Sequence, residues 1–186
     1  MFGVIARVQS EASKAELVAL SGQEPERFWA AYWGLRPGFD DGSYDAAAYW
    51  KAVQAELGTP LDAVALQAAD LRSWSRIDEE MVELLRSLRA RGDRLGLLSN
   101  ITPELADEFE RTHAWLDIFD VLGFSSRISH AKPSRQAFQW CLDRFGVPAG
   151  DILFIDDSPA NLVTAEAMGL RTHLFTGIDE LRRTLG

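Results

Sequence analysis

Two adjacent aspartates at the end of an apolar run are the residues of this chain best suited to metal chemistry. Asp156 and Asp157 directly follow the run DILFI and precede Ser158. Adjacent carboxylates at the end of a buried strand repel each other and lose solvation, and a cation beside them relieves both costs. Hard oxygen ligands at a partly hydrated site suit Mg²⁺. The alternative is that the pair only caps the next helix, but Ser158 stands where it could do that. The pair therefore predicts a Mg²⁺ site.

A serine, an asparagine and a lysine could complete a site for a phosphoryl group. Ser99 and Asn100 end the apolar run RLGLL, and Lys132 lies in the stretch SHAKPSRQAF. A hydroxyl can donate to phosphoryl oxygens, and an ammonium can balance their charge. Each residue also has an ordinary interpretation, as a turn serine or a solvated loop lysine. For Ser99 the two interpretations stay even, whereas a position beside the predicted strand ends favours a site role for Lys132.

Helices and strands are predicted to alternate from residue 78 onward. Asp78 begins a helix that ends at Gly92. Short apolar strands are expected in RLGLLSN, FDVLGFSS, DILFIDD and RTHLF. Strands that are apolar throughout and separated by helices are typical of a parallel sheet buried on both faces, which indicates an α/β fold. Ligands bind beyond the carboxyl ends of such strands, where Ser99 and Asp156 lie.

Residues 9–77 are predicted to form a separate group of helices. Apolar residues recur there at spacings of three and four in ASKAELVALSG, PERFWAAYWGL, SYDAAAYWKAVQAELG and LDAVALQAADLRSW. The many aromatic residues of this zone are interpreted as its core. Arg36, Asp40 and Tyr44, in the stretch LRPGFDDGSY, are interpreted as an exposed turn. The expected division is an α/β core of residues 1–8 and 78–186 and a helical lobe of residues 9–77.

Composition excludes several classes of protein. The chain has 186 residues, of which 47% are hydrophobic, and a net charge of −9, which argues against a nucleic-acid partner. No apolar stretch is long enough to span a membrane, and no signal peptide is evident. The single cysteine, Cys141, allows no internal disulfide, so a cytoplasmic location fits. The expected state is a monomer or a homodimer.

Three motifs in a fixed order resemble the haloacid dehalogenase (HAD) superfamily. LLSN, AKP and ILFIDDSPANLVTAEAMGL, with Asn161 four residues after Asp157, are similar to its second, third and fourth motifs. The resemblance covers essentially the whole chain. It implies a Rossmannoid core, with a central parallel sheet in a three-layer α/β/α arrangement, and a small all-helical cap formed by residues 9–77. The chain is similar to the branch of small-molecule phosphatases, such as those acting on sugar phosphates.

The resemblance also implies a role for each site residue. Ser99, with Asn100 beside it, would bind the phosphoryl oxygens. Lys132 would stabilise negative charge on the nucleophile and the phosphoryl group. Asp157 would be the direct Mg²⁺ ligand, and Asp156 would support the waters of the metal or the lysine. The implied substrate is a small phosphorylated metabolite.

The first motif of the superfamily, an apolar strand that ends in a nucleophilic aspartate, has no counterpart here. MFGVIARV aligns Met1 just after that aspartate, and Phe2 where many phosphatases carry a second one. The 186-residue chain is therefore expected to be inactive. A truncated N-terminus is the favoured explanation, because the family's first strand lies between those holding Ser99 and Asp156, and its loss leaves unpaired backbone groups. The other explanation is a catalytically dead protein.

Phe2 is the residue that suggests a second possible activity, the dehalogenation of 2-haloacids. An aromatic residue at this position resembles the dehalogenase branch, which uses no metal, whereas the pair Asp156–Asp157 favours a phosphatase. Phosphatase activity is therefore the first hypothesis and 2-haloacid dehalogenase activity the second. A non-enzymatic binding or regulatory protein is the third, and it becomes the first if Met1 is the genuine start.

Overall fold

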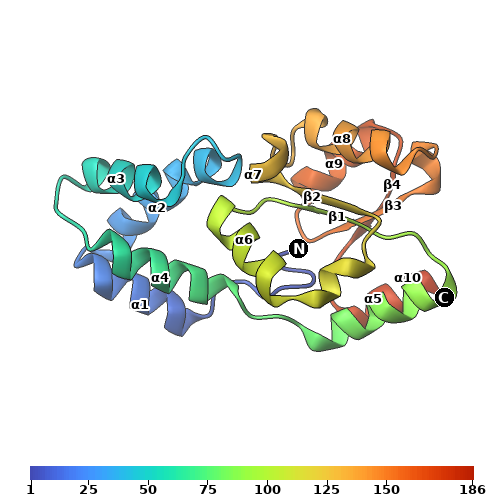
Figure 1. The fold of residues 1–186 in the computed structure, drawn as a ribbon, viewed down its shortest axis with the longest axis horizontal. Helices are drawn as coiled ribbons and strands as arrows, with labels where there is room; N and C mark the ends of the chain where they lie inside the picture. The colour runs from blue at the N-terminus through green and yellow to red at the C-terminus, as the bar shows by residue number, and fades with distance from the viewer.

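The four helices predicted for residues 9–77 are all present in the computed structural model, which describes residues 1–186. They are α1 (Glu11–Ser21), α2 (Pro25–Asp40), α3 (Ala46–Leu57) and α4 (Ala63–Trp74). Short polar side chains cap their starts: Ser10 accepts the N–H of Ser13 at 3.1 Å before α1, and Asp45 accepts that of Ala48 at 2.8 Å before α3. In Figure 1 these helices form a lobe beside the rest of the molecule.

Helix α2 continues further than expected, so the interpretation of Arg36 and Asp40 as an exposed turn is wrong. The helix runs through Pro37 to Asp40, and the Arg36 side chain is only 6% exposed. Pro37 and Gly38 are poor residues for a helix interior and led to the expectation of a turn. The helix continues because Arg36 is buried between two carboxylates: Asp40 of the same helix at 3.0 Å and Asp70 of α4 at 3.3 Å.

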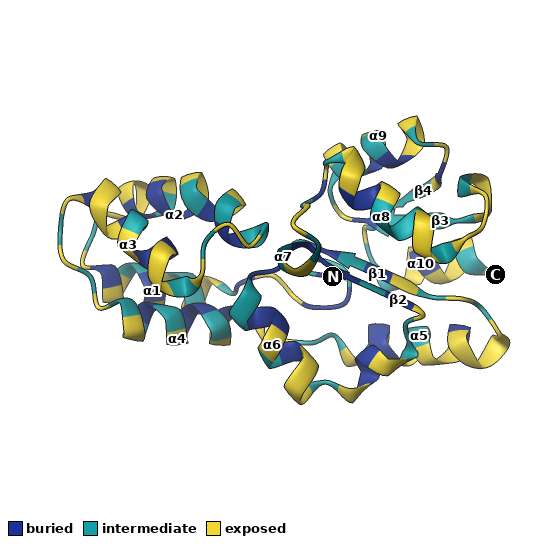
Figure 2. Ribbon diagram, turned by 45° about the horizontal axis from the view of Figure 1, so that its top comes forward, coloured by how far each residue is buried: buried dark blue, intermediate teal, exposed yellow.

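The helical lobe has an apolar core of its own. Aromatic side chains dominate it, and the buried members include Phe28, Tyr32, Phe39, Tyr49 and Trp50. Figure 2 shows the buried residues of these helices on the faces that point toward one another. The interpretation of the aromatic residues as core is confirmed for Phe28, Tyr32, Tyr49 and Trp50, but it is wrong for Trp33, which is 48% exposed.

The predicted alternation of helix and strand is also present from residue 78 onward. The helices are α5 (Glu79–Arg91), α6 (Pro103–Thr112), α7 (Ser125–Ile128), α8 (Arg135–Phe145), α9 (Pro159–Ala167) and α10 (Ile178–Leu185), with 3₁₀ turns η1 (Ala114–Ile118) and η2 (Ala149–Asp151). The strands are β1 (Gly96–Ser99), β2 (Val121–Phe124), β3 (Leu153–Asp156) and β4 (Arg171–Leu174). No helix is both long and apolar enough to cross a lipid bilayer.

The strands pair in parallel, as expected, but they form two separate pairs. Strand β1 pairs with β2, with Gly96 opposite Val121, and β3 pairs with β4, with Leu153 opposite Arg171. No strand joins β1 to β3. The parallel sheet is therefore divided into halves between the strands that end in Ser99 and Asp156.

Helices cover both faces of the divided sheet (Figure 1). Helices α8 and α9 lie on one side, and α5 and α10 lie on the other. The main apolar core of this part gathers side chains from residues 1–6, α5, α6 and β1, including Met1, Ile5, Met81, Leu97 and Phe109. Residues 1–6 form a turn rather than a strand, and Ala6 bridges Ile77 in antiparallel fashion.

Candidate functional site

The predicted site residues gather at the carboxyl ends of β1 and β3. Ser99 is the last residue of β1 and Asp156 the last of β3, and they are 1% and 3% exposed. Lys132, on the loop between α7 and α8, contacts both Asp156 and the residue after Ser99. The carboxyl ends of the two strands therefore meet at one edge of the fold.

Asn100 holds the loop of Lys132 against the end of β1. Its side-chain amide donates to the backbone carbonyl of Lys132 at 2.8 Å, and its oxygen accepts the backbone N–H of Lys132 at 2.7 Å. This pair of bonds fixes the backbone of the lysine from a strand end, which is the most rigid support the fold offers. Asn100 thereby positions the lysine, a role that the sequence did not indicate.

Lys132 and Asp156 form a buried ion pair. The ammonium nitrogen of Lys132 lies 2.6 Å from Oδ2 of Asp156, and the side chains are 6% and 4% exposed. Burial pushes the pKa of Asp156 upward, but the charge and hydrogen bond of Lys132, with help from Asn161 and Ser158, bring that pKa below its ordinary value. Asp156 is therefore held as a carboxylate beside the Lys132 side chain.

The second oxygen of Asp156 is also occupied. Oδ1 accepts the N–H of Ser158 at 2.9 Å and the side-chain amide of Asn161 at 2.8 Å. The expectation that Ser158 caps α9 is wrong, because its hydroxyl makes no capping bond. Asp156 binds the free N–H at the start of the helix instead, which explains its place there without a metal ion.

Asp157 differs from Asp156 in its exposure to solvent and in its hydrogen bonding, and both properties matter for metal binding. It is exposed, and its carboxylate accepts no hydrogen bond. The backbone of Gly3 lies directly against it, so that a Cβ at position 3 would overlap the Asp157 carboxylate. A free carboxylate beside a solvated edge fits Mg²⁺, which keeps several waters and needs only one or two protein carboxylates.

The hydroxyl of Ser99 is buried at the same edge. It is placed to donate to the carbonyl of Asn100 at 3.3 Å, a long hydrogen bond to a neighbouring residue. Such a weak bond leaves the hydroxyl free to turn toward a stronger acceptor. Ser99 therefore offers a donor near Lys132, as the site interpretation of the sequence requires.

Met1 lies next to Lys132, Asp156 and Asp157. The carbonyl of Met1 accepts the N–H groups of Val4, Ile5 and Ala6, which closes the turn of residues 1–6. Its α-amino group is buried among Lys132, Asp156 and Asp157. Burial, reinforced by the charge of Lys132, lowers the pKa of that amino group to about 5 despite the two carboxylates. Met1 thus lies at the carboxyl end of the divided sheet.

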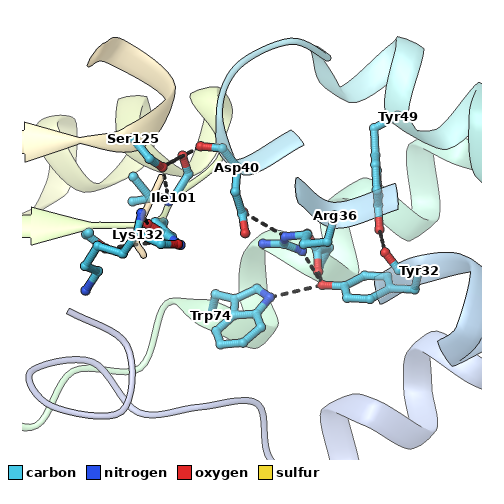
Figure 3. A network of polar contacts seen from close by, with 11 residues as sticks. Tyr32, Arg36, Asp40, Tyr49, Trp74, Ile101, Ser125 and Lys132 are labelled. Carbon is cyan, nitrogen blue, oxygen red and sulfur yellow. Dashed lines mark hydrogen bonds and ion pairs between the residues drawn. The ribbon is translucent and has the colours of Figure 1, made fainter. Parts of the chain in front are cut away.

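A second polar cluster lies in the helical lobe and faces the site (Figure 3). The hydroxyl of Tyr32 donates to Asp70 at 2.5 Å and accepts from the guanidinium of Arg36 and from the indole N–H of Trp74, the latter at 3.2 Å. Burial alone would lower the pKa of Arg36, but Tyr32, Asp70 and Asp40 raise it well above its ordinary value. The i, i+4 spacing of Arg36 and Asp40 was the one sequence signal for this cluster.

The lobe is joined to the core by contacts next to this cluster. The hydroxyl of Ser125 donates to the carbonyl of Asp40 and accepts the N–H of Ile101 at 2.9 Å (Figure 3). Glu104 accepts the N–H of Ala46 at 2.7 Å. The lobe is thereby held against the segments that follow β1 and β2.

Two sequence comparisons relate this chain to known hydrolases. A sequence profile of the haloacid dehalogenase-like hydrolases matches residues 5–169. A sesquiterpene phosphatase of Aspergillus oryzae is 24% identical over 152 residues, which are 80% of this chain and 78% of that protein.

Solved structures share the fold. A HAD family enzyme of Bacteroides thetaiotaomicron has a TM-score of 0.84 at 21% identity, covering 99% of this chain and 95% of that one, and a structure of its magnesium complex is also similar. An L-2-haloacid dehalogenase of Xanthobacter autotrophicus has a TM-score of 0.68 at 15% identity, covering 99% of this chain and 79% of that one.

Proposed function

Because the chain belongs to the haloacid dehalogenase-like hydrolase family, we propose that it is a Mg²⁺-dependent phosphatase of small phosphorylated metabolites. The observation that carries the proposal is the buried Lys132–Asp156 pair beside the unbonded carboxylate of Asp157. A phosphate ester needs cations to offset its charge and donors for its oxygens, and this edge of the fold offers both. The phosphatase of Aspergillus oryzae supports the reaction class.

In this proposal two residues handle the phosphoryl group directly, and a third positions one of them. The Lys132 ammonium stabilises its negative charge, the Ser99 hydroxyl donates to one of its oxygens, and Asn100 keeps the lysine in place through its two backbone bonds. Residues 9–77 act as a cap that covers the strand ends and limits access of water. The contacts of Ser125 and Glu104 with the lobe support that role.

Mg²⁺ would be held by Asp157, with Asp156 behind it. Asp156 has both oxygens engaged, so it supports the site through Lys132 rather than as the main ligand. When bound, the ion would neutralise part of the charge of the phosphoryl oxygens and orient them for attack.

The proposed reaction also needs a carboxylate that attacks phosphorus. Asp156 is not available for this step, because both of its oxygens already accept hydrogen bonds. The 186-residue chain is accordingly expected to bind its ligands without turnover.

Hydrolysis of p-nitrophenyl phosphate tests this function. The 186-residue chain and a chain extended by the codons upstream of Met1 would be compared with Mg²⁺ and with EDTA. Turnover only in the extended chain, and only with Mg²⁺, is the expected result. If the extension carries the aspartate and the enzyme stays inactive, the phosphatase proposal fails. Turnover by the 186-residue chain would show that the attacking group lies within it.

Dehalogenation of 2-haloacids is the second candidate, and Phe2 is the observation that favours it. Its ring packs edge-on against Trp74 at 5.1 Å and Phe109 at 5.9 Å, which supplies an apolar wall next to Met1. Release of chloride from 2-chloropropionate by the extended chain, unaffected by EDTA, would support it. A protein that binds phosphate or Mg²⁺ but turns over neither substrate would be the third, non-enzymatic, candidate.

A further inference from the structure

One large aromatic side chain of the helical lobe is left exposed. Phe28, Tyr32 and Phe39 of α2 are fully buried, whereas Trp33 of the same helix is exposed. A single exposed apolar residue is ordinary, but an exposed residue that belongs to a larger apolar surface marks a place where something binds. An indole ring also offers a large, rigid contact area. Trp33 is therefore a candidate contact for a ligand.

Trp33 belongs to a set of four aromatic rings in contact, Trp29, Trp33, Trp74 and Phe2, here called the aromatic row. Trp29 stacks on Trp33 with the ring centroids 6.4 Å apart. Trp33 packs edge-on against Trp74 at 6.2 Å, and Trp74 packs in the same way against Phe2 at 5.1 Å. The first two rings come from α2, the third ends α4, and the fourth belongs to the N-terminal turn. The row therefore connects the helical lobe with the core.

The inner end of the aromatic row lies at the proposed phosphoryl site. Phe2 follows Met1, whose amino group is buried beside Lys132 and Asp156. Figure 3 shows Trp74 on the side of the polar cluster that faces the N-terminal turn. A group attached to a phosphoryl group at Lys132 would therefore extend along the row, from Phe2 toward α2.

The polar groups behind the aromatic row bond to one another. The indole N–H of Trp74 donates to the hydroxyl of Tyr32 at 3.2 Å, and that hydroxyl donates to Asp70 at 2.5 Å. Arg36 pairs with Asp70 at 3.3 Å and with Asp40 at 3.0 Å. Tyr32, Arg36 and Asp70 are also buried, so they offer no hydrogen bonds to a ligand on the row. Sugar hydroxyls packed there would lose water without gaining partners, whereas a hydrocarbon group has no hydrogen bonds to lose.

We propose that the aromatic row binds the hydrocarbon part of a phosphate monoester, while Lys132 and Ser99 bind its phosphoryl group. The inference rests on the proposed phosphatase function and narrows its substrates to phosphate esters of apolar alcohols. Trp33 is then a specificity-determining residue, because it contacts the part of the substrate that does not react. Sugar phosphates, which the resemblance of the sequence suggested, are then poor ligands.

Calorimetric binding measurements on the 186-residue chain with Mg²⁺ test the proposal. Hexyl phosphate and glycerol phosphate carry the same charged group on an apolar and a polar alcohol, and inorganic phosphate carries no alcohol. Because each buried methylene group adds to the affinity, hexyl phosphate should bind at least about tenfold more tightly than glycerol phosphate. Equal affinities would overturn the inference and leave the proposed function standing. Absence of binding by all of these ligands would overturn both.

Trp33→Ala tests whether the hydrocarbon binds to the aromatic row. Because the ring is exposed, its removal leaves no internal cavity, and the variant should fold like the wild-type chain. Hexyl phosphate should lose most of its advantage over glycerol phosphate, whereas the affinity for inorganic phosphate should not change. Trp33→Phe keeps an aromatic ring and should recover part of the advantage. An undiminished preference for hexyl phosphate in Trp33→Ala would contradict the proposal.

Val64→Ala is the matched control. Val64 is also an exposed apolar residue of the helical lobe, on α4, but it lies outside the aromatic row. The substitution should leave the affinities for all of the ligands unchanged. If it weakens the binding of hexyl phosphate as much as Trp33→Ala does, the hydrocarbon has no defined place on the lobe and the inference is wrong.

Two other occupants of the aromatic row would give different results. Hexanol has the same hydrocarbon without the phosphoryl group and should bind at least about tenfold more weakly than hexyl phosphate. Equal binding of the two would show that the row acts independently of the phosphoryl site. Self-association measured by sedimentation, present in the wild-type chain and lost in Trp33→Ala, would show that a second copy covers the row. Either of these results would overturn the proposal.

Discussion

The ammonium of Lys132 and the carboxylate of Asp156 lie 2.6 Å apart, and both side chains are almost completely buried. Each member of the pair is also fixed by other bonds, the lysine backbone by Asn100 and the carboxylate by Ser158 and Asn161. The pair therefore joins the loop before α8 to the end of β3. We expect it to stabilise the fold and, in the proposed function, to present the Lys132 ammonium to the phosphoryl group.

Asp156→Asn tests the structural half of this role. The substitution leaves the Lys132 ammonium buried without a counter-charge, so the free energy of unfolding should fall by about 3–5 kcal/mol. Urea denaturation followed by circular dichroism measures it. Glu83→Gln is the matched control, because the Arg86–Glu83 pair is exposed and should contribute less than about 1 kcal/mol. Equal losses in the two variants would mean that the buried pair adds nothing to stability.

The location of this site could be predicted from the sequence, because the apolar runs RLGLL and DILFI are each followed directly by polar site residues. Once RLGLL and DILFI are accepted as parallel strands, Ser99 and Asp156 must come to the same edge. The different environments of Asp156 and Asp157 could not be predicted, since they depend on Lys132 and Gly3, which come from distant parts of the chain.

Asp157→Asn should separate the two aspartates by their response to Mg²⁺. The side chain is exposed and makes no hydrogen bond, so stability without Mg²⁺ should change by less than about 0.5 kcal/mol. If Asp157 is the metal ligand, Mg²⁺ should raise the Tm of the wild-type chain, and the variant should lose most of that shift. Asp151→Asn, at an exposed position just before β3, should keep it. An unchanged shift in the Asp157 variant would remove this residue from the metal site.

Gly3→Ala should be more damaging than an ordinary glycine substitution. Gly3 has φ +79°, and an added Cβ would overlap the Asp157 carboxylate. The cost of the positive φ alone can be measured with Gly22→Ala, because Gly22 has φ +63° and nothing within 4 Å of its Cβ position. We expect Gly3→Ala to lose at least about 1 kcal/mol more than Gly22→Ala in urea denaturation. Equal losses would show that residue 3 has room beside Asp157.

The polar cluster of the lobe shows where sequence reasoning fails. Pro37 and Gly38 indicated a turn, yet the helix continues because Arg36 pairs with Asp70, which lies in another helix. A contact between residues 34 positions apart leaves no local pattern. Most of the aromatic residues of the lobe were correctly interpreted as core, since their spacing is that of a helix face, but Trp33 is 48% exposed.

Asp40→Asn should change how stability depends on pH. Burial raises the pKa of Asp40, while Arg36 opposes the shift and the carboxylates of Asp70 and Asp41 add to it. The native state therefore holds a proton on Asp40 more tightly than the unfolded chain does. Between the ordinary pKa of an aspartate and the raised value, the Asp40 contribution to stability grows as the pH falls and shrinks as the pH rises.

An asparagine at position 40 cannot titrate, so that contribution disappears in the variant. The wild-type chain should gain stability relative to Asp40→Asn as the pH falls from 7 toward 4, measured by urea denaturation at several pH values. Asp41→Asn controls for the loss of one acidic group from the same turn and should leave the pH profile close to that of the wild type. A wild-type advantage that instead grows with rising pH would mean that Arg36 stabilises the Asp40 carboxylate by more than burial costs it.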